Sequence, residues 1–461
     1  MDSGATLNDL KVQVTDRQVL SIALPITFAI LIPQLNMLIN SIFLGRVSVA
    51  ALGNAGITGV FYLIFAVAGN GLNNAMQSVF SKNAGSGNPE NFKSILSQGI
   101  RISLQFATVC ILFTWFIAPF IMRAVTEPSA YHTEMNFLRI RILGLPFLYL
   151  FQMGNAFLVA SLNSRYLMIG FICEALVNIL FDWLLIFGHG GFPAMGFNGA
   201  AVASIIAEFT GLGVVLGVLF FSGLKRKYSL LKTFRYNGDI NRQILNVSVP
   251  LVTQYIISVT TWLVFFLLLE GRGPAAKAIS NVMRNVFGLT GVFVWAFAGT
   301  SNAMVSNLMG QKREDDVIPA INKIMLWSIG LCMLMVGLLN IFPGTFFRLF
   351  GQDDDFVKQG ITVIRMVSVG ILLMSIANIW LNGVTGTGKT RVNLGIEIIA
   401  IALYLGYTFY FMKVNYVSLA MAWSNEIIYW TAIFGLSFWY LKTGRWKTFP
   451  QIKEDQKADS R

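Results

Sequence analysis

The sequence predicts an all-α polytopic membrane protein with twelve transmembrane helices in two six-helix lobes. Of its 461 residues, 55% are hydrophobic and 12% are charged, whereas a soluble domain carries about 25% charged residues. Apolar segments long enough to cross the ~30 Å core of a bilayer as helices recur along the whole chain. The predicted spans are residues 18–42, 55–80, 92–118, 134–160, 166–187, 197–222, 245–269, 278–309, 317–343, 357–384, 392–412 and 416–441.

An internal repeat predicts how the two lobes are related. Gly71–Ser78 reads GLNNAMQS, and Gly299–Ser306 reads GTSNAMVS. Apolar segments match easily by chance, but the shared Asn and Ser and the matching order favour a duplication. Because each half has an even number of helices, both have the same orientation, and a pseudo-two-fold axis along the membrane normal relates them. Further pairs at matching positions are Pro25 with Pro250 and Glu174 with Glu397.

Charged loops predict the domain limits and the orientation. A basic segment, residues 224–242, is expected to be a cytoplasmic linker between an N-lobe (residues 1–223) and a C-lobe (residues 243–461). Lys and Arg are more numerous in loops on the linker's side, which predicts a plasma (inner) membrane protein with both termini cytoplasmic. The net charge of +12 then indicates lipid head groups rather than nucleic acid. We expect a monomer whose partners are membrane lipids and a small-molecule substrate.

The fifth predicted helix carries the polar group that most directly indicates function. Glu174, Asn178 and Asp182 recur every four residues in an apolar span, so a helix places them on one face. An ionised carboxylate inside a membrane is costly and is typical of an ion or proton site. A carboxylate hydrogen-bonded to neighbouring helices for packing is the alternative. Small residues in MGFNGAAVAS, residues 195–204, allow close helix approach and could bring Ser204 and a backbone carbonyl to Asp182.

The chemistry of these groups suits a small cation. Carboxylate, amide, hydroxyl and carbonyl oxygens are ligands for hard cations, so Asp182, Asn178 and Ser204 form a candidate Na⁺ site. The same carboxylate could instead bind a proton. On the first predicted helix, Pro25 and Pro33 predict bends, and the amides that follow them, Asn36 and Asn40 among them, either line a cavity or join helices.

Two acids of the second half are weaker candidates. Glu397 and Glu426 lie inside predicted spans, and each could serve function or a buried structural hydrogen bond. No nucleophile–base pair or multi-histidine metal set is evident, so we expect neither an enzyme nor a cofactor. Residues 383–390 read GVTGTGKT, which matches a phosphate-loop spacing, but the motif ends a membrane helix and lacks the strand–loop–helix context that nucleotide binding needs.

Taken in order, five motifs resemble the multidrug and toxic compound extrusion (MATE) family of secondary transporters over residues 17–442. These motifs are ALPITFAILIPQLNMLINSIFLGR, GLNNAMQSVFSKNAGSGN, NILFDWLLIFG, MGFNGAAVAS and GTSNAMVSNLMGQ. The resemblance implies two six-helix lobes around a central cleft. It also implies export of organic, often cationic, compounds in exchange for Na⁺ or H⁺.

The resemblance also implies a cation site in the N-lobe. The family's site takes an Asp from helix one, an Asn and an Asp from helix five, and a small residue and a Thr from helix six. Its bend-associated proline in helix one falls on Pro25. At the positions of these ligands, this sequence has the same Asn and Asp, Asn178 and Asp182, and the small residue Ala200, which would bind through its carbonyl oxygen. It has Ser204 in place of Thr and Asn40 in place of the helix-one Asp.

The change at Asn40 matters because an amide neither carries negative charge nor accepts a proton as a carboxylate does. We therefore expect Asp182 to be the N-lobe coupling group, with Asn40 as a neutral ligand. The predicted function is a cation-coupled antiporter that works by alternating access. The alternative is a flippase for lipid-linked saccharides, which a strongly cationic cleft would favour. A membrane protein that does not transport is a more distant possibility.

Overall fold

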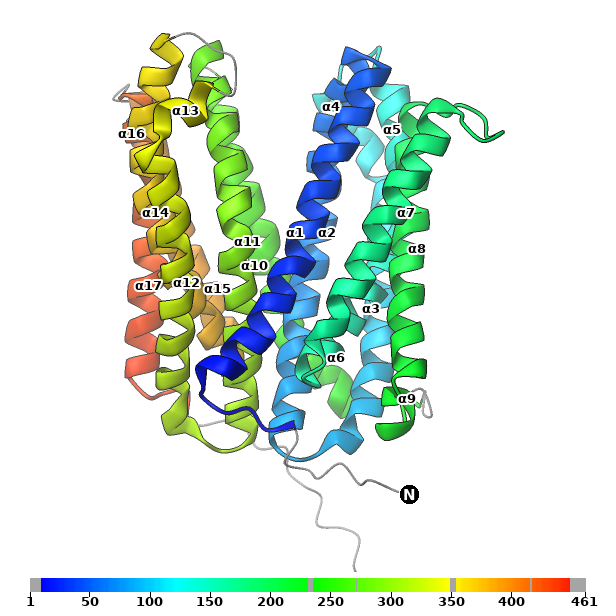
Figure 1. The fold of residues 1–461 in the computed structure, drawn as a ribbon, viewed down its shortest axis with the longest axis vertical. Helices are drawn as coiled ribbons and strands as arrows, with labels where there is room; N and C mark the ends of the chain where they lie inside the picture. Colours follow the sequence, from blue (N-terminus) through cyan, green and yellow to red (C-terminus); the bar gives the residue numbers. More distant parts are fainter. Residues whose placement is uncertain (1–9, 231–234, 271, 349–353, 415–416, 448–461) are drawn as a thin grey trace, which may run out of the picture.

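The protein forms two bundles of long helices that stand side by side (Figure 1). The structure is a computed structural model that describes residues 10–230, 235–270, 272–348, 354–414 and 417–447. The first bundle contains α1 (Asp16–Val47), α2 (Val49–Gly85), α3 (Phe92–Phe116), α4 (Ala118–Val125), α5 (Tyr131–Arg141), α6 (Leu145–Ala160), α7 (Leu167–Phe187), α8 (Phe197–Phe221) and α9 (Leu224–Lys227). The second contains α10 (Gly238–Glu270), α11 (Pro274–Gly310), α12 (Val317–Ile341), α13 (Pro343–Arg348), α14 (Asp354–Gly386), α15 (Thr390–Phe409), α16 (Leu419–Ala422) and α17 (Asn425–Lys442).

Twelve of these segments cross the molecule from end to end, which confirms the predicted fold class. Within the described residues, ten are long and apolar enough to span a membrane, and α2 and α17 complete the set. One span is composite, because α5 continues through the 3-10 turn Ile142–Gly144 into α6. The predicted domain limits stay a prediction. Part of the predicted linker, residues 231–234, lies outside the described residues, and α9 and the start of α10 occupy much of the rest.

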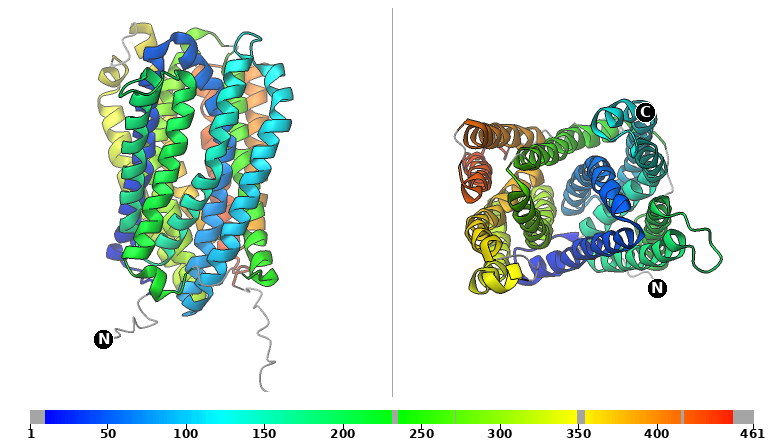
Figure 2. Two further views of the ribbon diagram at one scale, coloured as in Figure 1. Left: turned by 90° about the vertical axis from the view of Figure 1, so that its right-hand side faces the viewer. Right: turned by 90° about the horizontal axis from the view of Figure 1, so that it is seen from above.

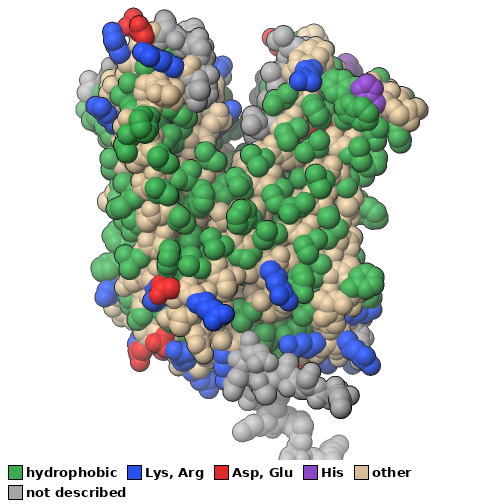
Figure 3. All heavy atoms as spheres, in the orientation of Figure 1, with side chains coloured by type: hydrophobic (Ala, Val, Ile, Leu, Met, Phe, Trp, Pro, Cys, Tyr) green, Lys and Arg blue, Asp and Glu red, His purple; other side chains and the backbone are tan. Residues whose placement is uncertain are grey.

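The surface around the middle of the molecule is apolar. Large side chains near the middle of the long helices, such as Val109, Leu176, Leu326 and Leu403, are well exposed, and hydrophobic side chains cover the central belt in Figure 3. An exposed apolar surface of this extent is unfavourable in water but matches lipid acyl chains. The belt therefore faces the membrane, and charged side chains gather at the lower rim in the same view.

The two halves of the chain meet through their repeated motifs, a contact that the sequence analysis did not predict. The hydroxyls of Ser78 on α2 and Ser306 on α11 are 2.8 Å apart, and Asn302 Nδ2 donates to the Asn74 carbonyl oxygen at 2.9 Å. Each pair joins a residue to its equivalent in the other half. Only residues on a two-fold axis contact their own equivalents, so the axis runs between α2 and α11. From above, the two halves occupy opposite sides of the molecule (Figure 2).

Two glycines let the lower ends of α2 and α11 pack backbone against backbone. A Cβ atom added at Gly85 would lie 1.9 Å from the Asn307 carbonyl oxygen, and one at Gly310 would lie 2.1 Å from the Lys82 carbonyl oxygen. Neither space can hold a side chain. The lobes are therefore in close contact at the end where Leu10 lies, whereas Figure 3 shows a hollow between them at the opposite end.

The segment before α1 crosses this closed seam. Val12 N donates to Asn307 Oδ1 at 3.1 Å, and Asn307 Nδ2 donates to the Leu10 carbonyl oxygen at 2.9 Å. Gln311 Nε2 donates to the Val12 carbonyl oxygen at 3.1 Å. Because Leu10 and Val12 are themselves buried, this segment ties the start of the first lobe to α11 of the second.

The helix α1 contains both predicted prolines, and its lower part leans away from its upper part in Figure 1. Proline has no N–H, so Pro25 leaves the carbonyl oxygen of Ser21 without its usual helical donor. Ser164, in the turn before α7, supplies one, since its Oγ donates to the Ser21 carbonyl oxygen at 3.1 Å. A hydroxyl from a neighbouring segment thus stabilises the helix where the proline interrupts it.

We predict that Asn307→Ala destabilises the protein by about 1–3 kcal/mol, because it leaves buried backbone groups of the Leu10–Val12 segment unpaired. Thermal unfolding in detergent should show a lower midpoint than the wild type. The matched control is Asn322→Ala, which removes the same side chain from an exposed position of α12. Equal losses in the two variants would contradict this role of Asn307.

Candidate functional site

Asp182, the main predicted site residue, lies on α7 and is fully buried. Neither of its carboxylate oxygens has a hydrogen-bond partner among the described residues. The side chain therefore does not face the lipid, and its negative charge is not balanced by local hydrogen bonds. Buried polar groups are nearly always paired, and an unpaired one indicates an ion, a water or a catalytic role. Asp182 is therefore the first candidate for binding a small cation or a proton.

Two glycine contacts fix how α8 lies against α7. A Cβ atom at Gly199 would lie 2.8 Å from the carbonyl of Leu185, and one at Gly211 would lie 3.3 Å from Glu174 Oε2. The two helices are therefore antiparallel, in a register that places Asp182 level with residues 202–204 of α8. This close packing brings the predicted ligand Ser204 to the same height as Asp182.

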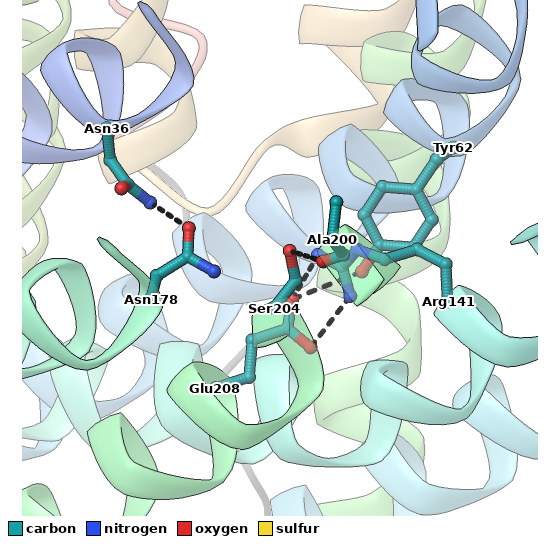
Figure 4. Close-up of polar contacts among 7 residues, drawn as sticks. All are labelled: Asn36, Tyr62, Arg141, Asn178, Ala200, Ser204 and Glu208. Carbon is teal, nitrogen blue, oxygen red and sulfur yellow. Dashed lines mark hydrogen bonds and ion pairs between the residues drawn. The ribbon is translucent and has the colours of Figure 1, made fainter. Parts of the chain in front are cut away.

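Ser204 and Ala200 are already bonded to each other. Ser204 Oγ donates to the Ala200 carbonyl oxygen at 2.9 Å, as Figure 4 shows. The hydroxyl oxygen keeps lone pairs that can accept a cation, whereas the carbonyl oxygen has one acceptor position occupied. The pair lies at the level of Asp182, but neither residue hydrogen-bonds to it, so their role as ligands stays a prediction.

The helix α1 also contacts α7, through the side-chain amides of one residue from each helix. Asn36 Nδ2 donates to Asn178 Oδ1 at 2.7 Å, and the two side chains point toward each other in Figure 4. The oxygen of Asn36 and that of Asn40 are buried without hydrogen-bond partners among the described residues. Together with Asp182, these amides supply acceptor oxygens of the kind that bind Na⁺. The sequence drew attention to Asn36 and Asn178 but not to their pairing.

An ion pair that the sequence analysis missed lies beside these residues. Arg141, at the end of α5, donates to both oxygens of Glu208 on α8, at 3.0 and 2.5 Å. Tyr62 of α2 donates to Glu208 Oε1 at 3.2 Å. The guanidinium carbon of Arg141 lies 3.9 Å from the centre of the Tyr62 ring. Figure 4 shows the three side chains together. The bidentate geometry and the stacked ring hold the guanidinium in one place.

Glu174, the other acid predicted on α7, lies near the same ion pair. Its Oε2 is buried without a hydrogen-bond partner among the described residues and faces Gly211. Arg141 is close enough to interact electrostatically with both Glu174 and Asp182. Among the described residues of this cluster, three carboxyl groups, those of Glu174, Asp182 and Glu208, lie near the guanidinium of Arg141.

The acids of the second lobe are surrounded differently. Glu397 is buried and accepts hydrogen bonds from Tyr429 at 2.5 Å, from Gln254 at 3.3 Å and from Ser258. Glu426 accepts hydrogen bonds from Trp430 at 3.0 Å and from Tyr404 at 3.5 Å. Because protein donors already satisfy these carboxylates, the structure favours the structural interpretation for both. No comparable set of donors surrounds Asp182 in the part of the chain that the structure describes.

The chain is similar in sequence and in fold to known transport proteins. The chain is 22% identical over 439 residues to "Probable multidrug resistance protein NorM" of Thermotoga maritima, covering 94% of this chain and 93% of that protein. It is 23% identical to "Uncharacterized transporter YisQ" of Bacillus subtilis, over 51% of this chain and 52% of that protein. Its fold is similar to that of a MOP superfamily transporter from Pyrococcus furiosus, with a TM-score of 0.87 at 15% identity, over 97% of this chain and 100% of that chain.

A second solved structure agrees in fold, an outward-facing MATE family transporter with a TM-score of 0.87 and 15% identity over 97% of this chain and 100% of that chain. The family model described as MatE matches the chain twice, at residues 25–184 and at residues 250–410. The two matches fall in the two halves that the repeat defines, and together they cover more than half of the sequence. The chain is therefore an integral membrane transport protein that belongs to the MatE family.

Proposed function

We propose that this protein is a cation-coupled antiporter that exports organic compounds, and that the coupling cation, Na⁺ or H⁺, binds at Asp182. The observation that carries the proposal is the fully buried carboxylate of Asp182, which has no hydrogen-bond partner among the described residues. A charge in such a place costs several kcal/mol unless a cation or a proton compensates it. Asn36, Asn40 and Ser204 supply neutral oxygens nearby.

Alternating access fits the way the lobes meet. The seam between α2 and α11 closes one end of the molecule, and the hollow between the lobes opens at the other. If the termini are cytoplasmic, as the loop charges predict, the structure is open to the outside of the plasma membrane. A cation shifts the balance between two states only by its different affinity for each. A cation that binds the Asn178 side-chain oxygen would compete with the hydrogen bond that Asn36 of α1 donates to it. Cation binding would therefore alter the contact between α1 and α7.

The charge of the lobe interior supports a cationic or amphiphilic substrate. Asp182, Glu174 and Glu208 outnumber the neighbouring Arg141, so the potential there favours positive charge. The relative from Thermotoga maritima is named as a probable multidrug resistance protein, which agrees with export of varied organic compounds. We propose that the unit of transport is a monomer, since each chain has both lobes.

A flippase for lipid-linked saccharides is the alternative. Such a substrate carries phosphate groups, which free guanidinium groups bind well. The arginine beside the candidate site, Arg141, is instead bound through both nitrogens to Glu208, and it is not available for phosphate. The antiporter is therefore the better supported of the two functions.

We predict that Asp182→Asn reduces gradient-driven transport at least tenfold. Purified protein in liposomes would be tested with a panel of cationic dyes, with Na⁺ and proton gradients imposed separately. The matched control is Glu397→Gln, which neutralises a buried acid of the other lobe that is already hydrogen-bonded. Full transport by Asp182→Asn under both gradients would overturn the proposed site. Movement of a lipid-linked saccharide without dye transport would favour the flippase.

We also predict that a disulfide between residues 78 and 306 stops transport. The Ser78 and Ser306 hydroxyl oxygens are 2.8 Å apart, so two cysteines at these positions are close enough to be oxidised to a disulfide. The double variant, made without Cys110, Cys173 and Cys332, should transport when reduced and lose transport when oxidised. Each single cysteine variant should be insensitive to the oxidant. Undiminished transport by the cross-linked protein would show that this seam does not open.

A further inference from the structure

We propose that Arg141 is a positioning residue that sets the cation affinity of Asp182, and that Glu208 controls how strongly it does so. This inference rests on the proposed function, because it requires that a cation binds at Asp182. Arg141 would act through its charge and not as a ligand, since its guanidinium nitrogens donate to Glu208.

The register of α7 and α8 gives the separation of the two groups along the helices. Asp182 is level with residues 202–204 of α8, and Glu208 is about five residues further along. At 1.5 Å per residue, the Arg141–Glu208 pair is roughly 8 Å from Asp182 along the helix axis. Glu208 is buried and Arg141 is mostly so, with side-chain exposures of 4% and 13%. Because little water separates the groups, their charges are only weakly screened.

The guanidinium is held at this distance from three sides. Glu208 binds it through two hydrogen bonds, the ring of Tyr62 stacks on it, and a Cβ atom at Gly144 would lie 2.8 Å from Arg141 Nη1 and 2.2 Å from Glu208 Oε2. Glycine at position 144 therefore leaves the space that the pair occupies. A fixed charge near an unpaired carboxylate exerts a constant effect on any cation that binds there.

The sign of this effect follows from the charges present. A cation bound at Asp182 is repelled by Arg141 and attracted by Glu208 and Glu174, and the neighbouring polar groups of α1 and α8, Asn36, Asn40 and Ser204, are neutral. The guanidinium thus weakens cation binding and favours release, which an antiporter needs in each cycle. Glu208 offsets most of this repulsion, so that the site binds its cation with intermediate affinity.

The inference predicts opposite effects from two neutral substitutions. Arg141→Gln removes the repulsion and should lower the half-saturating cation concentration about tenfold, with a lower maximal transport rate because release becomes slower. Glu208→Gln leaves the guanidinium uncompensated and should raise the half-saturating concentration about tenfold. The double variant Arg141→Gln/Glu208→Gln should lie within about threefold of the wild type, because both charges are gone.

The experiment is a titration of each purified variant in nanodiscs with NaCl at fixed pH and, separately, with acid in the absence of Na⁺. Intrinsic tryptophan fluorescence reports binding, and Trp183 lies next to Asp182 on α7. Transport rates in liposomes give the second readout. The matched control is Arg139→Gln, which removes the same charge from the same helix at a side chain that stacks on Trp115. It should leave the half-saturating concentration unchanged.

The outcomes separate this inference from the function on which it rests. If the wild type shows no cation response, or if Asp182→Asn responds like the wild type, the proposed site is wrong and the inference is overturned with it. If the response requires Asp182 but Arg141→Gln does not tighten binding, only the inference is overturned. If Glu208→Gln fails to fold, the cation titration of Arg141→Gln still tests the inference, because misfolding cannot produce tighter cation binding.

Discussion

The constraint on which this structure depends is that a charge buried in a membrane protein needs a compensating partner. Glu208 has Arg141, and Glu397 has three hydrogen-bond donors. Asp182 has neither, although it is the most deeply buried of the three. A carboxylate left in that condition would be selected against unless it is neutralised from outside the protein. The difference in partners, and not burial alone, separates the candidate coupling residue from the structural acids.

A second property follows from the duplication. Residues on the two-fold axis meet their own equivalents, so Ser78 with Ser306 and Asn74 with Asn302 join the two lobes there. The lobes are also in contact through close approaches at glycines and through one buried apolar cluster that includes Phe80 of α2 and Met304 of α11.

Much of the fold could be predicted from the sequence, because apolar length and an internal repeat directly determine the number and orientation of spans. Helix ends were less predictable. The seventh span was expected to begin at residue 245, but α10 begins at Gly238 because Asn237 Oδ1 accepts from the backbone N–H groups of Asp239 and Ile240. This capping extends the helix beyond its apolar part.

The candidate site could be predicted only in part. Asp182 was identifiable because a carboxylate in an apolar helix is unusual in any sequence. The sequence analysis did not predict the ion pair between Arg141 and Glu208. The available signal was that an arginine and an acid each lie inside a predicted span, where charged residues need a partner. Their pairing depends on how α5 and α8 pack, as the Asn36–Asn178 bond depends on α1 and α7. Contacts between helices are not encoded in the pattern of one segment.

The two halves have diverged at the positions of the candidate cation site. The offset between Glu174 and Glu397 places Ile401 and Leu405 at the positions equivalent to Asn178 and Asp182. The second lobe therefore lacks the amide and the carboxylate there, and its remaining acid is bound by protein donors. In the first lobe, the unpaired groups lie beside α1, which also packs on α11 of the other lobe. The candidate site therefore lies in one lobe, and α1 contacts both this site and the other lobe.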